Sequence, residues 1–256
     1  MLNFLTAQTA RSGGNTMRID VMGVQFDNVT MDEAVARAAE LLEAPGASYA
    51  VTPNAEIVYE AMHDASLREL LNGADLVLPD GSGIVLGAKL LKTPLKEKVA
   101  GIDFADQLCA YLAKNGLPLY LLGSKPGIAE AAAENLKKKH EGLIVCGTAD
   151  GYFKDEAPVV AAINEARPAA LFVCLGAPKQ EKFMTAHQSE LDVRFMIGLG
   201  GSLDGFAGTV KRAPRWMQRC GLEWFYRLVK EPKRIGRMMR LPKFVLAVLR
   251  RRRKGA

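Results

Sequence analysis

Residues 119–139 read LYLLGSKPGIAEAAAENLKKK, and this stretch decides the fold class. Its first four residues are apolar, as in a buried strand, and a turn at Gly123–Gly127 leads into a helical pattern. The alternation continues, with apolar runs at 144–146, 171–175 and 195–197 and helical patterns beginning near Ala157 and Lys179. Strands and helices alternating at this spacing predict an α/β protein with a Rossmann-like, mostly parallel sheet flanked by helices.

The preceding part of the chain follows the same pattern. Thr30-Met31-Asp32-Glu33 is a capping box and predicts a helix that reaches about Glu43. Asn115-Gly116 is a C-cap signal that ends a helix begun at Asp103. The remaining predicted strands are Arg18–Val24, Tyr49–Thr52 and Asp75–Pro79, and the remaining helices cover 55–62, 66–72 and 82–91.

The pattern changes after Gly208, where three prolines separate three basic, helix-prone pieces. Residues 211–256 carry 16 Lys and Arg against two acidic residues, whereas the other 210 residues carry 18 basic and 26 acidic residues. A basic tail on an acidic body indicates an anionic partner: membrane lipid, nucleic acid or a phosphorylated ligand. We therefore predict a loose leader (1–17), an α/β catalytic domain (18–210) and a basic helical, membrane-associating appendage (211–256).

Several classes of protein are disfavoured. No apolar run near either end approaches the roughly 20 residues of a membrane span, and the leader is a poor signal peptide. The four cysteines and three histidines lack metal-ligand spacing, which predicts buried thiols, a cytosolic compartment and no metal site. No Asp-x-Asp triplet occurs, so side chains or backbone amides, rather than a divalent ion, are expected to stabilise leaving-group charge.

Five polar or glycine-rich turns each follow a predicted strand, which is where open α/β sheets bind their ligands. They are Thr52–Asn54, Pro79–Gly81, Gly123–Gly127, Gly176–Gln180 and Gly198–Ser202. Together they predict a cleft for a phosphate-bearing ligand. Taken alone, Gly123–Gly127 is equally a tight turn, because it lacks the Lys-Ser/Thr pair of an ATP-binding loop. Gly198–Gly201 lacks the full dinucleotide fingerprint.

Asp80 is a candidate for chemistry. It lies at a strand end between Pro79 and Gly81, a position that suits a general base reaching a substrate hydroxyl. The alternative is a structural role, because aspartate also stabilises turns and caps helices, here the helix over 82–91.

Three arginines of the tail form a second candidate group. Arg227, Arg234 and Arg237 are spaced by seven and three residues, so a single helix would place them on one face. That face would be either a diphosphate clamp or a solvated basic surface over packed aromatic residues. Pro232 is positioned to interrupt such a helix.

Nine segments, in their order and spacing, resemble the WecG/TagA/CpsF glycosyltransferase family, from about Ile19 to Arg237. They are VTPNAEIV (51–58), ADLVLPDGSGIV (74–85), VAGIDF (99–104), LYLLGSKPG (119–127), DGYF (150–153), LGAPKQE (175–181), GLGGSLDGFAG (198–208), KRAPRWM (211–217) and GLEWFYRLVKEPKRIGR (221–237). The leader and the terminal RRRRK (250–254) lie outside this pattern. The resemblance implies an inverting, metal-independent transferase that uses no cofactor.

Within the family, the chain is most similar to the members that build the teichoic-acid linkage unit. The resemblance implies transfer of N-acetylmannosamine from UDP to undecaprenyl-diphosphate-linked N-acetylglucosamine, while sister members use other UDP-sugars such as UDP-N-acetylmannosaminuronic acid. It implies catalytic roles for Asp80 and Thr52, and substrate binding by Asn54, Gln180, Gly123, Tyr152, Arg227, Arg234 and Arg237.

The implied partners are a UDP-sugar donor, a polyprenyl-diphosphate-linked sugar acceptor and an anionic membrane surface, with no nucleic acid. We therefore expect a cytoplasmic protein peripherally associated with the inner face of the cell membrane; a homo-oligomer stays open. Two other classes also stay open, a non-enzymatic membrane- or nucleic-acid-binding module and a nicotinamide oxidoreductase. UDP tests the first, because a pure binding module would not be thermally stabilised by it.

Overall fold

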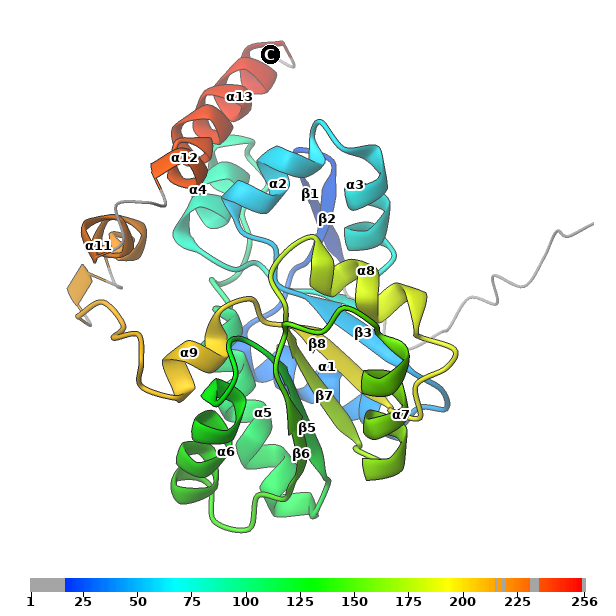
Figure 1. The fold of residues 1–256 in the computed structure, drawn as a ribbon. Helices are drawn as coiled ribbons and strands as arrows, with labels where there is room; N and C mark the ends of the chain where they lie inside the picture. The colour runs from blue at the N-terminus through cyan, green and yellow to red at the C-terminus, as the bar shows by residue number, and fades with distance from the viewer. Residues whose placement is uncertain (1–16, 215, 218–219, 231–234, 255–256) are drawn as a thin grey trace, which may run out of the picture.

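A computed structural model describes residues 17–214, 216–217, 220–230 and 235–254, with the backbone alone at Arg227, Arg237, Met238 and Lys254. The predicted leader, apart from Met17, lies outside the described residues. The main sheet has six strands, all parallel, in the order β4-β3-β8-β7-β5-β6 (Figure 1). These strands are β3 (Ser48–Val51), β4 (Leu76–Val77), β5 (Leu119–Gly123), β6 (Val145–Ala149), β7 (Ala170–Cys174) and β8 (Phe195–Gly198). The predicted Rossmann-like α/β fold is confirmed.

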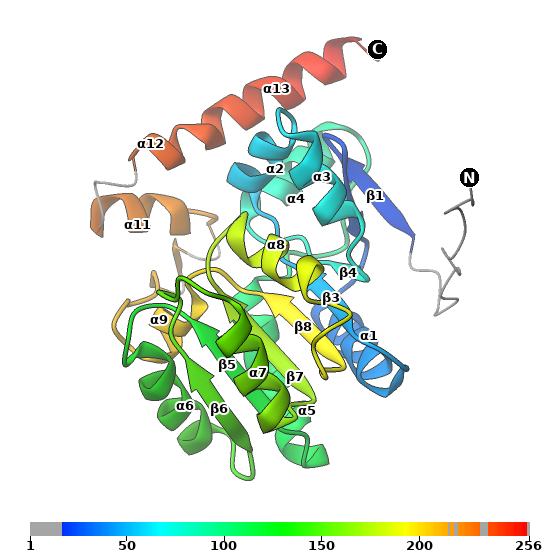
Figure 2. The same ribbon diagram turned by 45° about the vertical axis from the view of Figure 1, so that its right-hand side comes forward.

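Helices cover both faces of the sheet, and each face has its own hydrophobic core (Figure 2). One face carries α1 (Met31–Glu43), α5 (Gly101–Asn115), α6 (Ile128–Lys139) and α9 (Ser202–Phe206). The other carries α7 (Ala157–Ala166) and α8 (Lys179–Ala186), and its core continues into α2 (Ala55–Ala61), α3 (Ala65–Asn72) and α4 (Ser82–Leu90). Because both faces are covered, the inner strands β3, β8, β7 and β5 are buried at every residue rather than alternating between buried and exposed side chains.

Local signals in the sequence account for the helix ends. The predicted capping box is present: the Thr30 hydroxyl accepts a hydrogen bond from the Glu33 N–H, and the Glu33 carboxylate accepts one from the Thr30 N–H at 2.8 Å. Gly116 ends α5 with a left-handed φ of 63°, as its C-cap position requires.

The prediction of one strand over Arg18–Val24 is wrong. The segment forms β1 (Arg18–Val21) and β2 (Val24–Asp27), which pair antiparallel in a separate two-stranded sheet. Met22 and Gly23 reverse the chain between them, with φ of 58° and 95°. A two-residue turn with both φ values positive is the usual connection of a tight hairpin, which the apolar run concealed.

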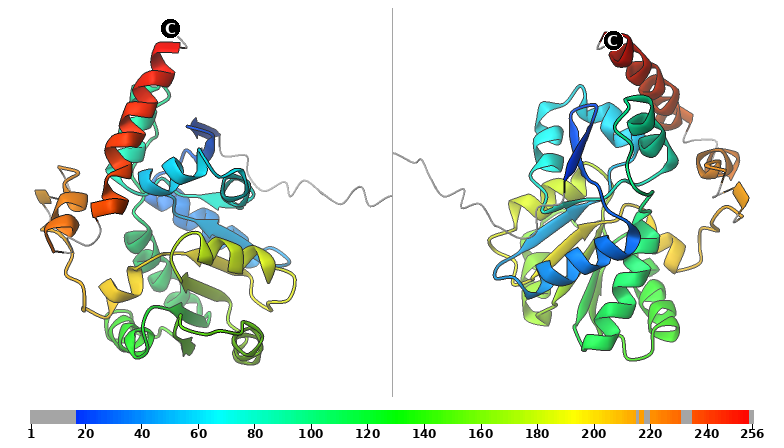
Figure 3. Two further views of the ribbon diagram at one scale, coloured as in Figure 1. Left: turned by 45° about the horizontal axis from the view of Figure 1, so that its top comes forward. Right: turned by 180° about the vertical axis from the view of Figure 1, so that it is seen from behind.

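The basic tail contains α11 (Glu223–Lys230), α12 (Ile235–Met238) and α13 (Arg240–Lys254), and α13 lies along α2 and α4 (Figures 1 and 3). Phe244 and Val248 of α13 are fully buried in the core shared with those helices. A Cβ added to Gly87 of α4 would lie 2.9 Å from Phe244 Cζ, so the phenyl ring packs into space that any larger residue at position 87 would fill. Within the part of the chain that the structure describes, no helix is long and apolar enough to cross a membrane.

Candidate active site

The carboxyl ends of the six parallel strands meet along one edge of the sheet. The register aligns Val77, Val51, Gly198, Val173, Leu122 and Ala149 in a single row across β4, β3, β8, β7, β5 and β6. The five turns singled out in the sequence therefore leave the sheet side by side, as predicted. Their backbone amides and side chains line the edge at which sheets of this type bind ligands.

Thr52 follows β3 and is buried. Its hydroxyl donates a hydrogen bond to the carbonyl oxygen of Gly198 at 2.8 Å, which ties the end of β3 to the end of β8. Gly101, at the start of α5, packs against this side chain, and a Cβ added to Gly101 would lie 3.1 Å from Thr52 Cγ2. The hydroxyl orientation is therefore held by the surrounding backbone.

Asp80 is half-buried and follows β4, the outer strand on the other side of β3. Its N–H donates to the Leu78 carbonyl at 2.9 Å, and the carbonyl of Pro79 accepts from Val99 N–H at 3.0 Å. Gly81 has a φ of 86°, a conformation that favours glycine, and it is Gly81 that occupies the N-cap position of α4. Asp80 therefore does not occupy the N-cap position of α4, and its stabilisation of the turn stays a prediction.

Asn54 has a structural partner. It is the N-cap of α2, and its side-chain oxygen accepts hydrogen bonds from the N–H groups of Glu56 at 2.9 Å and Ile57 at 3.1 Å. A Cβ added to Gly81 would lie 3.8 Å from Asn54 Cβ, so the cap stands beside the Asp80 turn. The cap itself fixes the orientation of this amide.

Gln180 and Glu181 form a buried relay at the start of α8. The side-chain oxygen of Gln180 accepts from Gly200 N–H at 2.9 Å, and its Nε2 donates to Glu181 Oε1 at 2.9 Å. Glu181 Oε2 is buried and has no hydrogen-bond partner among the described residues. Burial raises the pKa of the Glu181 carboxyl, and the hydrogen bond from Gln180 opposes this rise only in part. The relay fixes both the glycine turn after β8 and the amide of Gln180.

Gly123 and Tyr152 lie toward the far side of the edge, Gly123 as the last residue of β5 and Tyr152 in the loop after β6. Gly123 has a φ of 130°, and an added Cβ would lie 2.3 Å from the carbonyl oxygen of Cys174, so only glycine fits there. Tyr152 is 68% exposed. Because β4 and β6 are the two outer strands, Tyr152 and Asp80 mark opposite ends of the edge.

The tail arginines are only partly described. Arg234 lies outside the described residues, and Arg227 and Arg237 are described by their backbone, in α11 and α12 respectively. Since α11 ends at Lys230 and α12 begins at Ile235, Arg227 and Arg237 belong to two helices rather than one. The tail does reach the site elsewhere: a Cβ added to Gly221 would lie 3.0 Å from Ser82 Cβ, two residues after Asp80.

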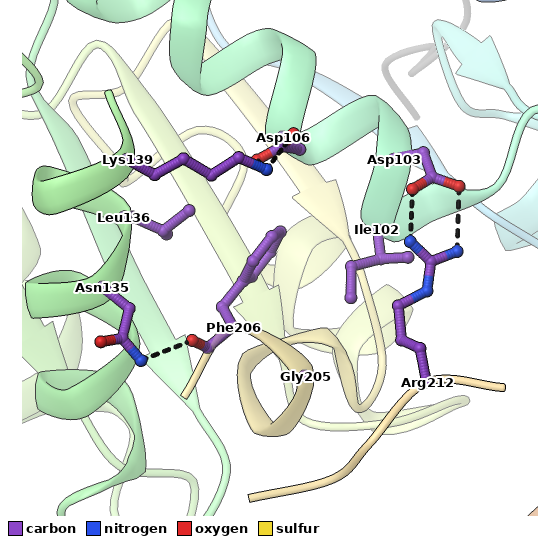
Figure 4. Close-up of a pocket in the computed structure, with 9 residues that line it drawn as sticks. All are labelled: Ile102, Asp103, Asp106, Asn135, Leu136, Lys139, Gly205, Phe206 and Arg212. Carbon is purple, nitrogen blue, oxygen red and sulfur yellow. Dashed lines mark hydrogen bonds and ion pairs between the residues drawn. The ribbon is translucent and has the colours of Figure 1, made fainter. Parts of the chain in front are cut away.

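A cavity of about 260 Å³ lies between α5, α6, α9 and the start of the tail (Figure 4), and none of its lining residues belongs to the five turns. Two ion pairs line it. Arg212 donates to the Asp103 carboxylate through Nη1 and Nη2, and Lys139 Nζ contacts Asp106 Oδ2 at 2.6 Å. Sequence reasoning did not single out Arg212 or Asp103. The signal was present, since both lie in segments that carry the family resemblance.

Among the described residues, no cluster of three His, Cys, Asp or Glu side chains could hold a metal ion. Cys109 and Cys174 are buried as predicted, and burial raises the pKa of each thiol to about 12. The prediction that all four thiols are buried is wrong, because Cys220 is exposed at the end of a tail segment.

The Rossmann-like sheet, with a carboxylate, a fixed hydroxyl and glycine turns at its carboxyl edge, places a candidate general base beside turns of the kind that bind ligands in such sheets. The chain belongs to the glycosyl transferase WecG/TagA/CpsF family, whose model matches residues 19–256. The match continues past Arg237, so the expectation that RRRRK lies outside the family pattern is wrong. Family membership favours neither a non-enzymatic binding module nor a nicotinamide oxidoreductase.

Curated relatives are similar over most of their length. A protein of Bacillus subtilis (strain 168) is 37% identical over 199 residues, 78% of each chain. A protein of Staphylococcus aureus (strain MRSA252) is 34% identical over 250 residues, 96% of this chain and 98% of the relative. Both are named N-acetylglucosaminyldiphosphoundecaprenol N-acetyl-beta-D-mannosaminyltransferase. The family resemblance seen in the sequence is confirmed.

Proposed function

We propose that this protein transfers N-acetylmannosamine from UDP to undecaprenyl-diphosphate-linked N-acetylglucosamine, a step of teichoic-acid linkage-unit synthesis. The observation that carries the proposal is the similarity to named N-acetylmannosaminyltransferases over 96% of this chain. The position of Asp80 at the carboxyl edge of the sheet supports it, because an acceptor hydroxyl there has a carboxylate within the same row of turns.

In the proposed reaction the acceptor hydroxyl attacks the anomeric carbon of the donor sugar. Asp80 takes the hydroxyl proton as the new carbon–oxygen bond forms, and the bond from the anomeric carbon to the UDP oxygen breaks on the opposite face. The configuration at the anomeric carbon therefore inverts. Thr52 and the relay of Gln180 and Glu181 keep the glycine turn after β8 in place beside the reacting groups.

The negative charge that develops on the UDP diphosphate needs cationic or N–H donors. In the proposal Arg227, Arg234 and Arg237 supply guanidinium groups, and Gln180 supplies the Nε2 hydrogen not used by Glu181. Asn54, Gly123 and Tyr152 complete the proposed binding surface, with Gly123 allowing close approach of the backbone and Tyr152 offering an exposed ring.

The acceptor lipid places the reaction at the cytoplasmic face of the cell membrane in this proposal. The tail offers exposed apolar side chains beside basic ones, which suits an anionic lipid surface. On α13, Leu246 is exposed and lies three residues after Lys243 and four residues before Arg250, on the same side of the helix. Leu249, three residues after Leu246, is also exposed. Trp224 and Phe225 of α11 are also exposed.

The test is a donor screen with purified protein and a water-soluble acceptor, N-acetylglucosamine-diphosphate on a short isoprenoid. UDP-N-acetylmannosamine, UDP-N-acetylmannosaminuronic acid and UDP-N-acetylglucosamine are compared, and products are identified by mass spectrometry and by NMR of the anomeric proton. We expect an inverted disaccharide product with UDP-N-acetylmannosamine alone. A retained configuration, or preference for another donor, would contradict the proposal.

The same assay tests metal independence. We expect turnover to survive excess EDTA, because no Asp-x-Asp triplet is available to hold a divalent ion on the diphosphate. Loss of turnover that Mg²⁺ or Mn²⁺ restores would show that side chains alone do not stabilise the leaving group.

A further inference from the structure

A short chain of ion pairs joins the beginning of the tail to the body. Arg212 Nη1 and Nη2 contact the two carboxylate oxygens of Asp103 at 2.5 and 3.0 Å, a two-pronged pairing visible in Figure 4. Arg212 Nη2 also lies 3.8 Å from Glu223 Oε1 of α11, and Glu223 Oε2 lies 4.0 Å from Lys98 Nζ. Two tail residues, Arg212 and Glu223, thus bind two body residues, Asp103 and Lys98.

The body partners flank the backbone that holds the proposed catalytic side chains. Asp103 is two residues beyond Gly101, which packs against Thr52. Lys98 precedes Val99, whose N–H donates to the carbonyl of Pro79, the residue before Asp80. The ion pairs therefore bring α11 to the two places where the body backbone touches the Thr52 and Asp80 turns.

The contact between Arg212 and Asp103 is a bidentate ion pair, which is stronger than a single hydrogen bond between the same groups. A guanidinium that meets a carboxylate through two parallel hydrogen bonds has a defined orientation as well as an attractive charge. Both ends are partly shielded from solvent, with 30% of the Arg212 side chain and 44% of the Asp103 side chain exposed. The pKa of Arg212 is raised, chiefly by its hydrogen bonds to Asp103, against the opposing effect of burial; Glu223 and Asp80 add to the attraction. Removing the guanidinium would leave these carboxylates near one another without their shared cation.

The tail is attached to the body a second time through α13. Phe244 packs against Gly87 of α4, and Arg240 Nη1 forms an ion pair with Glu60 Oε2 at 2.6 Å. α11 lies between this attachment and the ion pairs of Arg212. Its first residue, Glu223, contacts both Arg212 and Lys98, so breaking the pairing of Arg212 with Asp103 weakens the attachment at that end of α11 while α13 stays docked.

We infer that Arg212 and Asp103 form a clasp that positions α11 over the Asp80 edge, so that Arg212 is a positioning residue of the transferase. The effect on activity rests on the proposed function, in which Arg227 of α11 meets the diphosphate. Opening the clasp moves α11 without removing any group that touches substrate. A misplacement of about 1 Å in a catalytic group lowers turnover on the order of 10²-fold.

The test is a double-mutant cycle of Arg212→Gln, Asp103→Asn and the two combined, assayed on the water-soluble acceptor. If the two residues act only as a clasp, each single variant should lose kcat on the order of 10²-fold. The kcat of the double variant should then be no lower than that of the less active single variant. Binding to vesicles of anionic phospholipid should stay near that of the wild type, because α13 is untouched. Arg212→Lys keeps the charge but not the two-pronged geometry, and its kcat should lie between wild type and Arg212→Gln.

Hydrogen exchange gives a readout that needs no substrate. The amides of α11 should exchange at least about tenfold faster in Arg212→Gln and Asp103→Asn, while those of α5 and α13 stay unchanged. The matched control is Arg37→Gln, which breaks an ion pair of 2.6 Å with Glu40 on α1, away from the tail, and should change neither kcat nor α11 exchange.

Three outcomes separate the explanations. If Arg212→Gln is inactive while Asp103→Asn behaves as wild type, Arg212 acts on substrate directly and the clasp is refuted. If α11 exchange is unchanged in both variants, the ion pairs do not hold the helix and the inference is equally refuted. If the wild type transfers no sugar in the donor screen but α11 exchange rises as expected, the proposed function fails while the clasp stands.

Discussion

Asp80 belongs to a backbone segment with little conformational freedom. The carbonyl before it accepts from Val99 N–H, its own N–H donates to Leu78, and the residue after it has a φ of 86° that favours glycine. A carboxylate on such a segment is held near a fixed position before substrate arrives, which is what general base catalysis needs.

Replacing Asp80 with asparagine tests its role as the base. Asp80→Asn keeps the size of the side chain but cannot accept the hydroxyl proton, so we expect kcat to fall on the order of 10²-fold or more. UDP affinity, measured by calorimetry, should barely change, because the proposed diphosphate contacts are made by other residues. Turnover close to wild type would remove Asp80 from the catalytic role. Asp75→Asn is no suitable control, since its carboxylate accepts from Tyr49 N–H; Asp32→Asn, on the surface of α1, is the better one.

Glu181 predicts a pH dependence of stability. Because burial raises the pKa of its carboxyl in the folded state above the 4.5 of a free glutamate, the folded protein holds this proton to higher pH than the unfolded chain does. Its contribution to the free energy of unfolding therefore falls as pH rises from about 4.5 through the folded pKa. Glu181→Gln keeps an oxygen acceptor for Gln180 and cannot ionise.

We therefore expect Glu181→Gln to gain stability relative to wild type as pH rises from 4 to 8, in urea unfolding followed at each pH. Glu134→Gln makes the same chemical change at an exposed position of α6 and should show no such trend. A constant difference between Glu181→Gln and wild type across this range would mean that the pKa of the Glu181 carboxyl is the same in the folded and unfolded protein.

At the scale of elements, α4 links the proposed base to the tail. Its first turn follows Asp80 directly, its residue Ser82 lies against Gly221, and Gly83 and Gly87 receive Leu241 and Phe244 of α13. The two glycines lower the helix propensity of α4, and they allow another helix to approach more closely than any side chain would permit. The docking of α13 is thus a property of α4 as much as of the tail.

Phe244→Ala tests how far α13 belongs to the folded core. Truncating a fully buried phenylalanine leaves a cavity in the core shared by α2, α4 and α13 and should lower the free energy of unfolding by about 3–5 kcal/mol. Leu246→Ala, on the exposed side of the same helix, should change it by about 0.5 kcal/mol or less. Chemical denaturation of both variants measures the difference. Equal effects would show that α13 packs loosely.

At the scale of the whole molecule, charge is divided between an acidic body and a basic tail, with 16 Lys and Arg and two acids in residues 211–256. An acidic body would repel the diphosphates of the proposed substrates unless cationic groups nearby offset its negative charge. In the proposed function the tail supplies such groups through Arg227, Arg234 and Arg237, and it also presents basic residues to solvent along α13. In the proposed function, one tail therefore has two separable tasks, catalysis and membrane contact.

Two sets of variants separate these tasks. Arg227→Ala should lower kcat on the water-soluble acceptor by about 10²-fold, since a charged donor to the leaving group is lost, while binding to anionic vesicles persists. Lys243→Ala combined with Arg250→Ala, both exposed on α13, should weaken vesicle binding by about 2 kcal/mol and leave soluble turnover unchanged. Wild-type turnover in Arg227→Ala would mean that the tail is an anchor and that the clamp lies in the body.

Most of the fold could be predicted because its signals are local. The capping box at Thr30, the C-cap at Gly116 and the apolar runs of β5, β7 and β8 depend on neighbouring residues alone. The hairpin at Met22–Gly23 was missed because it interrupts an apolar run without any polar turn residue. The five turns at strand ends were recognisable from local residues, and their meeting at one edge follows from the parallel sheet, which sends all the carboxyl ends of its strands to the same side.

By itself, the sequence determined the α/β class, the family and the turns that carry Thr52, Asp80 and Gln180. Only the tertiary structure decided the strand order, the burial of Glu181, the seat of Phe244 on α4 and the pairing of Arg212 with Asp103 across 109 residues. The physical reason is range. Helix and strand periodicity arises within a few residues, whereas burial and ion pairing depend on which distant segments the folded chain brings into contact.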